Sequence, residues 1–502
     1  MDRQIRRLGV ALMVCFTALF LQLTYIQVFR ADELNDRPGN SRPIDATFSR
    51  ERGTIASADG AVLARSVPSN DRYTFQREYP EKSLFGHVTG YFNYSFGASG
   101  LELEYNSELA GRTTKQQIRS LGDLFVEKDR TGNLELTIRK DVQQVARDSL
   151  GERKGSVVAI DVKTGGVIAM WSYPSYDPNI LSAHPDGAIR PSVAAKELLD
   201  ADPNKPLLAK SYRDIFFPGS TFKVITGSAG LVSGKVTKET PSYPVVTSYT
   251  PPGTTRPIRN FGGAACGGTL FPILAKSCNS SFAQMGDDVG ADGMISTSEA
   301  YGFNQVPPID LPGAVASHFP ESFRDPASGK DDLAALAQSS IGQRDVQASP
   351  LQMAMVAAAI GNKGQMMVPH LVQEIRDGEG ALVSDPGSKV WKTVVDPAVA
   401  QTMHDAMIGV VQNGSAKALA IPGFEVGGKT GTAQLGLEPP QSHTWIIGFA
   451  GPPGDPQVAV AVIVERQPGA SEATGGRIAA PIGRAVLAQA LQPIPESGGA
   501  GD

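Results

Sequence analysis

Residues 217–225 read Phe-Pro-Gly-Ser-Thr-Phe-Lys-Val-Ile. The Pro-Gly turn precedes a helical pattern, so Ser220 is expected in the first turn of a helix, at the positive end of its dipole. Lys223 follows three residues later and shares that helix face. The hydroxyl and the amine can therefore lie side by side, as a serine nucleophile with a lysine base requires. Such turns are common on surface helices, but no other Ser-x-x-Lys occurs in the chain.

The composition is that of a folded protein with more than one domain. The chain has 502 residues, which exceeds what one hydrophobic core usually serves. Apolar residues make up 41% and charged residues 19%. A net charge of −5 argues against a nucleic-acid partner. Three cysteines are too few for a disulfide framework.

The N-terminal segment predicts a membrane anchor. Arg3, Arg6 and Arg7 precede an apolar run at residues 8–29, and a spanning helix needs about 20 such residues. Cations before the run and acidic residues after it favour a cytoplasmic tail at residues 1–7 and an extracytoplasmic remainder, on a single-pass protein of the cell membrane. A cleaved signal peptide is the alternative, but it would have a shorter apolar core and a small-x-small cleavage site.

Residues 30–150 predict a mainly β pedestal domain. Residues 52–64 read as strand, Asp-Gly turn and strand, which is typical of a hairpin. Residues 97–106 indicate a loop entering a helix, for which simple packing is a sufficient explanation. Residues 134–138 alternate like a strand, and residues 140–150 carry a partly apolar helix face.

Residues 151–492 predict an α+β domain, followed by a disordered tail at residues 493–502. Strand-like runs stand at both ends of this domain, and helical segments dominate between them. The pattern predicts one antiparallel sheet built from the two ends and flanked by helices. The strands are expected at residues 156–162, 167–171, 444–450 and 458–464, and the helices at 222–232, 333–340, 351–360 and 478–491.

A second unique motif can supply partners to Ser220 and Lys223. Ser277, Cys278 and Asn279 form the only Ser-x-Asn of the chain. In a catalytic site the second hydroxyl would relay a proton, and the amide would orient a substrate carbonyl. The alternative is an Asx-type turn that caps the following helix.

A third motif, Lys-Thr-Gly, occurs twice. The copy at residues 163–165 lies between two strands and is best explained as a hairpin turn. The late copy, Lys429, Thr430 and Gly431 followed by Thr432, comes after the strand-like residues 424–426 and before another predicted strand. A strand edge with a positive charge and hydroxyls can receive an extended peptide and its terminal carboxylate, and a glycine leaves room for close backbone approach. The late copy is therefore assigned to the site.

The three motifs stand in the order found in penicillin-binding proteins and class A β-lactamases. The chain resembles class B, monofunctional penicillin-binding proteins over nearly its whole length, including the anchor, and most of all their actinobacterial members. No glycosyltransferase domain fits before residue 150. The resemblance implies a serine β-lactamase-like transpeptidase domain on a pedestal. Further matching stretches are residues 52–55, 100–102, 340–343, 349–354 and 443–445.

The resemblance also implies a mechanism. Ser220 would attack the penultimate D-Ala carbonyl of a peptidoglycan stem peptide, and a neutral Lys223 would take its proton. Ser277 would pass that proton to the departing D-Ala, and Asn279 would hold the acyl-chain amide. The substrate carboxylate would bind to Lys429, Thr430 and Thr432, and the oxyanion to the backbone N–H groups of Ser220 and Thr432.

Partners and alternatives follow from the same resemblance. No metal or organic cofactor is expected. The partners would be stem peptides on nascent glycan strands, β-lactam antibiotics, a polytopic membrane glycan polymerase and other division proteins. A D,D-carboxypeptidase would share every motif, and a non-enzymatic scaffold could merely be acylated. A β-lactamase would need a deacylation base, and no Glu-x-x-Leu-Asn stretch occurs between residues 280 and 430.

The middle residue of the second motif departs from the usual pattern, because many relatives carry Ser or Asp where this chain has Cys278. In the family's usual geometry this position points away from the substrate. Cys266 and Cys278 would both lie on the oxidising side of the membrane, where a disulfide between them could stiffen the loop. Two buried thiols are the alternative, since a sequence does not fix the distance between cysteines.

Overall fold

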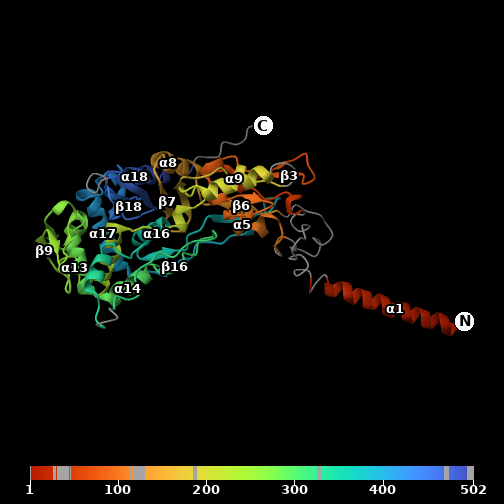
Figure 1. Cartoon of the computed structure of the whole chain (residues 1–502), viewed down its shortest axis with the longest axis horizontal. Helices are drawn as coiled ribbons and strands as arrows, with labels where there is room; N and C mark the ends of the chain where they lie inside the picture. Colours follow the sequence, from red (N-terminus) through yellow and green to blue (C-terminus); the bar gives the residue numbers. More distant parts are fainter. Residues whose placement is uncertain are drawn as a thin grey trace.

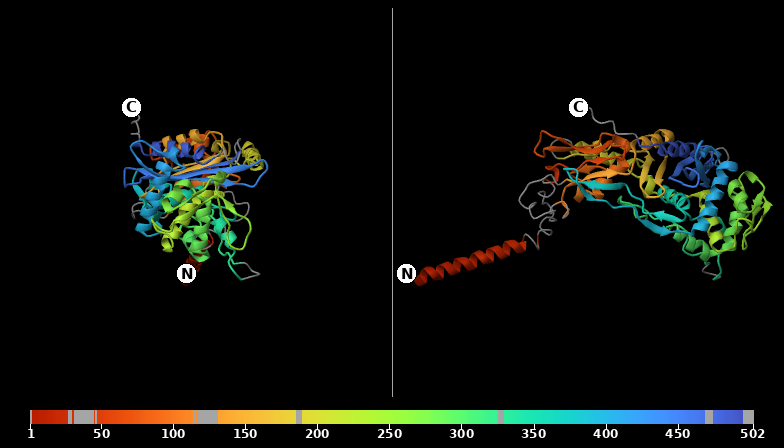
Figure 2. Two further views of the ribbon diagram at one scale, coloured as in Figure 1. Left: turned by 90° about the vertical axis from the view of Figure 1, so that its left-hand side faces the viewer. Right: turned by 180° about the vertical axis from the view of Figure 1, so that it is seen from behind.

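The computed structural model describes residues 2–26, 30, 45, 47–113, 116, 131–184, 189–324, 329–468 and 474–494. Helix α1 (Asp2–Thr24) stands apart from the folded body (Figures 1 and 2). It is long and apolar enough to cross a membrane, and it is a candidate span. The end of the predicted anchor at residues 27–29 and most of the predicted tail, from residue 495, lie outside the described residues.

The catalytic half of the molecule is built on a five-stranded antiparallel sheet in the order β17-β18-β19-β7-β8. Two strands come from the start of the predicted domain and three from its end, which confirms the sequence prediction. Strand β17 lies at one edge, so one side of its backbone pairs with no other strand of this sheet. The strands are β7 (Gly155–Asp161), β8 (Val167–Tyr173), β17 (Glu425–Gln434), β18 (Gln441–Gly451) and β19 (Val458–Pro468).

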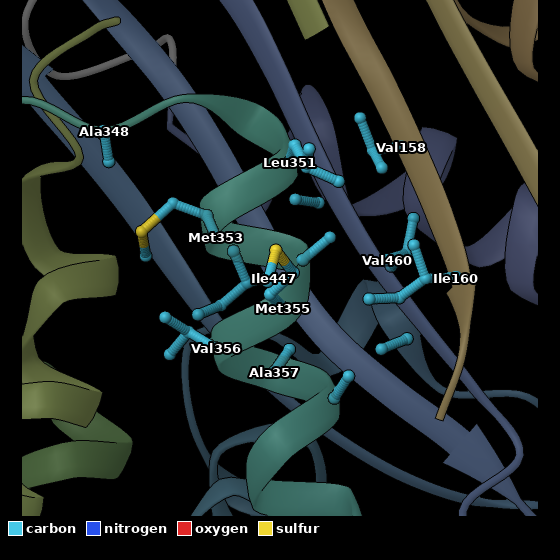
Figure 3. Close-up of a cluster of buried hydrophobic side chains, with 14 of the residues drawn as sticks. Val158, Ile160, Ala348, Leu351, Met353, Met355, Val356, Ala357, Ile447 and Val460 are labelled. Atoms are coloured by element: carbon cyan, nitrogen blue, oxygen red, sulfur yellow. The ribbon is translucent and has the colours of Figure 1, made fainter. Parts of the chain in front are cut away.

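Helices cover both faces of this sheet. Every residue of α16 (Pro350–Gly361) is buried, and Leu351 and Met355 extend from it toward the sheet residues Val158 and Val460 (Figure 3). Full burial of one such side chain contributes about 1.5–3 kcal/mol. Helices α8 (Lys140–Leu150) and α18 (Ala479–Ala490) pack against each other on the opposite face (Figure 1).

The remaining helices of this half lie mainly between the two strand groups, as predicted. The predicted helices at residues 222–232, 333–340, 351–360 and 478–491 are confirmed, with ends that differ by one or two residues. The intervening helices are α9 (Ile189–Ala201), α10 (Lys210–Arg213), α11 (Lys223–Val232), α12 (Leu270–Lys276), α13 (Asn279–Val289), α14 (Ala291–Ala300), α15 (Leu333–Ser339) and α17 (Pro397–Asn413).

A second sheet forms the N-terminal part, with six strands in the order β15-β14-β6-β1-β2-β3. Its β1–β2 pair is the hairpin predicted around the Asp-Gly turn. Two of its strands come from residues 372–384, which the sequence analysis had assigned to the second domain. The strands are β1 (Ile55–Ala56), β2 (Val62–Pro68), β3 (Phe75–Glu78), β6 (Asn133–Leu136), β14 (Val372–Arg376) and β15 (Leu382–Ser384).

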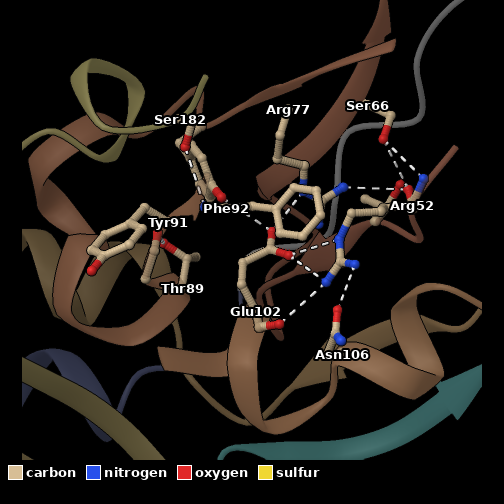
Figure 4. Close-up of polar contacts among 12 residues, drawn as sticks. Arg52, Ser66, Arg77, Thr89, Tyr91, Phe92, Glu102, Asn106 and Ser182 are labelled. Atoms are coloured by element: carbon tan, nitrogen blue, oxygen red, sulfur yellow. Dashed lines mark hydrogen bonds and ion pairs between the residues drawn. The ribbon is translucent and has the colours of Figure 1, made fainter. Parts of the chain in front are cut away.

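A buried cluster of charges, which we call the arginine–glutamate cluster, lies beside this second sheet (Figure 4). Glu102, on the short helix α5 (Gly100–Glu104), is fully buried between Arg52 at 2.8 Å and Arg77 at 2.6 Å. Burial alone would raise the pKa of Glu102, but the two arginines outweigh it and lower that pKa. The cluster joins two stretches, residues 52–55 and 100–102, which the sequence had interpreted as the start of a hairpin and as a packed loop before a helix.

Candidate active site

The predicted nucleophile lies in a short 3₁₀ helix, η5 (Gly219–Phe222), which leads directly into α11. Residues three apart eclipse in a 3₁₀ helix, so the Ser220 and Lys223 side chains leave the same face. Gly219 has a φ of 52°, and a Cβ there would lie 3.0 Å from the Thr432 carbonyl oxygen. A glycine is therefore required where this turn meets β17.

Two hydrogen bonds tether this turn to other parts of the fold. The Gly219 N–H donates to the Gly342 carbonyl at 2.9 Å, and the Trp445 indole N–H donates to the Phe217 carbonyl at 3.0 Å. Trp445 is fully buried on β18. Ser220 is thus held between the central sheet and the loop after α15, while its own side chain is only half-buried.

Lys223 is fully buried and points to the second motif. Its Nζ donates to the Ser277 carbonyl at 2.8 Å and to Asn279 Oδ1 at 2.6 Å, and it lies 3.2 Å from Ser277 Oγ. Within the described residues, the Ser220 hydroxyl makes no hydrogen bond to Lys223. The structure thus brings the predicted residues together, and the Lys223 amine makes its hydrogen bonds with the Ser-x-Asn segment.

Ser277 links two lysines. Its hydroxyl also accepts a hydrogen bond from Lys429 Nζ at 2.8 Å. Ser277 ends α12 in the left-handed conformation, with a φ of 58°, which costs a non-glycine residue roughly 1 kcal/mol. The motif does not adopt the alternative capping role, because the residue before α13 is Cys278 and its side chain makes no capping hydrogen bond.

The two lysines share an environment without a compensating acid. Lys223 and Lys429 are both fully buried, and neither forms an ion pair within the described part of the chain. Burial lowers the pKa of Lys429 to about 7. Burial, and secondarily the charge of Lys429, lowers the pKa of Lys223 well below its usual value. Near neutral pH one amine can therefore act as a base while the other carries charge.

The late Lys-Thr-Gly copy lies on edge strand β17, beside the Ser220 turn. Thr430 Oγ1 lies 2.7 Å from Ser415 Oγ, and Thr432 Oγ1 accepts a hydrogen bond from the Gly475 N–H at 3.5 Å. A Cβ at Gly431 would come within 2.8 Å of the Pro218 carbonyl oxygen, so glycine permits the close approach here.

The early Lys-Thr-Gly copy has a different structural role. It forms the β7–β8 turn, in which Asp161 accepts hydrogen bonds from the backbone of Lys163 and Thr164. The Lys163 side chain is partly exposed and pairs with Asp455 at 3.3 Å. This confirms the turn predicted from the sequence.

A neighbouring segment supports the second motif through links that the sequence did not signal. The Arg259 carbonyl accepts from Asn279 Nδ2 at 2.9 Å, and Asn260 Oδ1 accepts from the Ser280 N–H at 2.8 Å. A disulfide joins Cys266 to Cys278, with Cα atoms 5.9 Å apart. From the sequence alone, two buried thiols were an open alternative to this bond.

His443 lies at the back of the site without a place in the lysine cluster. Its Nδ1 accepts a hydrogen bond from the Arg466 N–H at 3.3 Å, and its ring packs edge-on against Phe216. Burial lowers the pKa of His443 to about 4, so it is neutral at pH 7. Within the described residues, no group of three or more His, Cys, Asp or Glu side chains is placed to hold a metal.

Comparisons with known proteins agree with this fold. Residues 155–488 match the penicillin binding protein transpeptidase domain, and residues 52–134 match the penicillin binding protein A dimerisation domain. The chain is 40% identical to the peptidoglycan D,D-transpeptidase PbpA of Mycolicibacterium smegmatis, over 98% of this chain and 99% of the relative. It is 38% identical to PbpA of Mycobacterium tuberculosis, over 99% and 100%.

Solved structures give the same result. The crystal structure of penicillin-binding protein A from M. tuberculosis superimposes with a TM-score of 0.78 at 36% identity, over 88% of this chain and all of that one. The chain belongs to the class B penicillin-binding proteins, which carry a transpeptidase domain. Within that class it resembles mycobacterial penicillin-binding protein A.

Proposed function

We propose that this chain cross-links peptidoglycan stem peptides as a D,D-transpeptidase, through an acyl-enzyme on Ser220. The observation that carries the proposal is the pair of buried, acid-free lysines joined through the Ser277 hydroxyl beside the Ser220 turn. A general base that works at neutral pH needs such a depressed pKa.

Acylation begins with neutral Lys223. A neutral amine has two N–H donors and one lone pair, and the Ser277 carbonyl and Asn279 Oδ1 are close enough to take the two donors. The lone pair takes the Ser220 proton while Ser220 Oγ bonds to the penultimate D-Ala carbonyl carbon. The proton then passes through Ser277 to the nitrogen of the terminal D-Ala, and the carbon–nitrogen bond breaks.

The oxyanion and the substrate carboxylate are bound by backbone and side-chain donors. The Ser220 N–H belongs to the first turn of a helix, where N–H groups lack intrahelical partners, and it pairs with the Thr432 N–H as the oxyanion hole. Lys429, Thr430 and Thr432 bind the terminal carboxylate along edge strand β17. Asn279 Nδ2 uses one hydrogen on Arg259 and keeps the other for the acyl-chain amide.

In the second half-reaction an amine from a neighbouring stem attacks the acyl-enzyme and releases Ser220. β-Lactams imitate the D-Ala-D-Ala end and leave Ser220 acylated. The solved M. tuberculosis relatives include ceftriaxone, imipenem and penicillin G acyl-enzyme complexes, which supports this part of the proposal.

The proposal includes a membrane location. Helix α1 anchors the chain with its N-terminus in the cytoplasm, because arginines precede the apolar run. The catalytic domain then lies outside the cell membrane, where cross-linking takes place, next to a glycan polymerase and other division proteins. The orientation can be tested with single cysteines introduced before α1 and in the folded domain. A thiol reagent that does not cross the membrane should label the second and not the first in intact cells.

The function is tested on the purified full-length chain in two assays. Fluorescent penicillin should label wild type and leave Ser220→Ala unlabelled. Incubation with uncross-linked strands should give cross-linked dimers that penicillin suppresses. Labelling of Ser220→Ala to the wild-type level would refute the assigned nucleophile, and release of D-Ala without cross-links would identify a carboxypeptidase.

A further inference from the structure

A cavity of about 460 Å³ lies between the N-terminal part and the catalytic domain, lined by residues other than those of the site above. Residues 86–100 form one wall, and α9, α10 and the segment between them form the other. Small-ligand sites are typically about 300–1,000 Å³ in volume. The cavity is thus large enough for a ligand of one or two rings.

The charges on its wall favour an anion. Lys196 is paired with Asp200 at 2.6 Å. Lys205 and Arg213 are exposed, and neither has an ion-pair partner within the described parts of the chain. His87 adds no charge at neutral pH, because burial lowers its pKa to about 4. Asp214, next to the wall, interacts electrostatically with Lys205. The lining side chains themselves still carry three cations and one carboxylate, and this excess of positive charge attracts negatively charged ligands.

The same wall offers aromatic rings and hydroxyl groups. Tyr91 points away from the arginine–glutamate cluster (Figure 4), and Tyr91 and Tyr212 both line the cavity. Burial raises the pKa of Tyr212 to about 12, so its hydroxyl stays protonated and can donate. Tyrosines combine an apolar ring face with a polar tip, which suits a ligand with rings, hydroxyl groups and carboxylates.

The cavity also lies close to Ser220 along the chain. Arg213 ends α10, and Ser220 follows seven residues later. Seven residues span at most about 25 Å, and a five-residue stem peptide extends to about 17 Å. The cavity wall at Arg213 therefore lies no more than about 25 Å from the backbone of the nucleophile, a distance on the scale of one disaccharide unit with its stem.

We propose that this cavity binds a segment of the uncross-linked peptidoglycan strand, with a sugar ring on the partly exposed Tyr91, a hydroxyl contact to the buried Tyr212 and a stem carboxylate on Lys205 and Arg213. This inference rests on the proposed function and names a second contact with the same substrate. It would hold the strand in register while its stem reacts, which favours polymeric substrates over free peptides.

The test measures binding without catalysis, in full-length protein carrying Ser220→Ala. The probes are uncross-linked peptidoglycan oligosaccharides with stems, and the same oligosaccharides after enzymatic removal of the stems, titrated by calorimetry. Lys205→Gln combined with Arg213→Gln should weaken binding of the stem-bearing probe about tenfold or more, because charge-assisted hydrogen bonds are lost. Binding of the stem-free probe should change little.

Arg147→Gln is the matched control, since Arg147 is an exposed cation on α8 that pairs with its neighbour Asp148. Equal affinity of the double variant and the control for the stem-bearing probe would overturn the proposal, as would equal weakening for both probes. Labelling of Ser220-containing protein by fluorescent penicillin is read separately. Its absence would count against the proposed function and leave the cavity measurement intact.

Discussion

Two clusters of buried cations in this molecule offset the cost of burying charge in opposite ways. In the arginine–glutamate cluster, Arg52 and Arg77 share the fully buried carboxylate of Glu102. In the active site, Lys223 and Lys429 share only the neutral hydroxyl of Ser277. Burial penalises a charge in both places. A carboxylate offsets the penalty in the first cluster. In the second the amines have only neutral hydrogen-bond acceptors, and loss of a proton removes the rest of the penalty.

The difference separates a structural use of charge from a chemical one. An arginine cannot give up its proton in a protein, so the first cluster stays charged and ties together segments distant in sequence. A lysine can lose its proton, and burial lowers the pKa of Lys429 to about 7. The absence of a carboxylate beside the lysines within the described residues is therefore what makes a base available.

The strongest test places a permanent charge in the lysine cluster of the active site, as in the arginine–glutamate cluster. Lys223→Arg places a permanent cation where the proposed base stands, and Lys223→Met removes the amine. Both should lower the second-order rate constant for acylation by fluorescent penicillin about 10³-fold, within the range for loss of a general base. Arg52→Lys is the counterpart in the other cluster and should leave acylation near wild type. Acylation by Lys223→Arg at the wild-type rate would show that Lys223 is not the base.

The converse test removes the carboxylate from the structural cluster. Glu102→Gln leaves two arginines buried without a counter-charge, which should destabilise the N-terminal part by about 3–5 kcal/mol. Urea unfolding combined with hydrogen exchange in the six-stranded sheet measures this loss. Glu78→Gln is the matched control, because Glu78 and Arg65 form an exposed pair, and it should change stability by less than about 1 kcal/mol.

A pH titration distinguishes the two clusters in the wild-type protein. The acylation rate constant should rise with pH as Lys223 loses its proton. It should fall above about pH 7, by up to tenfold per unit, as Lys429 loses the charge that binds the substrate carboxylate. Because this is the second-order rate constant for free enzyme reacting with inhibitor, its pH dependence reports the pKa values of the lysines in the free enzyme. A flat profile between pH 6 and pH 9 would contradict the depressed lysines.

Stability should follow the same titration. The folded-state pKa of Lys429 lies below its unfolded value of 10.5. Between about pH 7 and 10.5 the unfolded chain therefore binds more protons, and this group's contribution to folding stability rises with pH across that window. The arginine–glutamate cluster has no such window, because its cations keep their protons there.

The sequence predicted the catalytic sheet because its strands are nearly continuous apolar runs, and it predicted α8 and α16 because their patterns are long. It could not predict that residues 372–384 join the N-terminal sheet. Those strands are short, and their partners lie far away in the chain. Nothing local in a strand specifies which partner it will pair with.

The residues of the site were predictable from sequence motifs, but the contacts that hold those residues in place were not. Ser220, Lys223, Ser277 and Lys429 were selected from three short patterns, and the structure brings them together. The tethers from Arg259 and Asn260 depend on tertiary packing and leave no pattern in the sequence. The cluster around Glu102 was missed for the same reason, because its members are isolated charged residues in separate segments.

The smallest expected effect comes from replacing the whole structural cluster. Arg52→Met, Arg77→Met and Glu102→Leu together remove the charges and keep most of the volume, and such replacements are often neutral or stabilising. One arm of Arg77, Nη2, already lacks a hydrogen-bond partner, so part of its desolvation is uncompensated. The triple variant should therefore lose no more than about 1–2 kcal/mol in urea unfolding, less than Glu102→Gln alone, because no charge is left unpaired. If the triple variant unfolds as easily as Glu102→Gln, the charges contribute net stability in the N-terminal part, and the two clusters differ less than their electrostatics suggest.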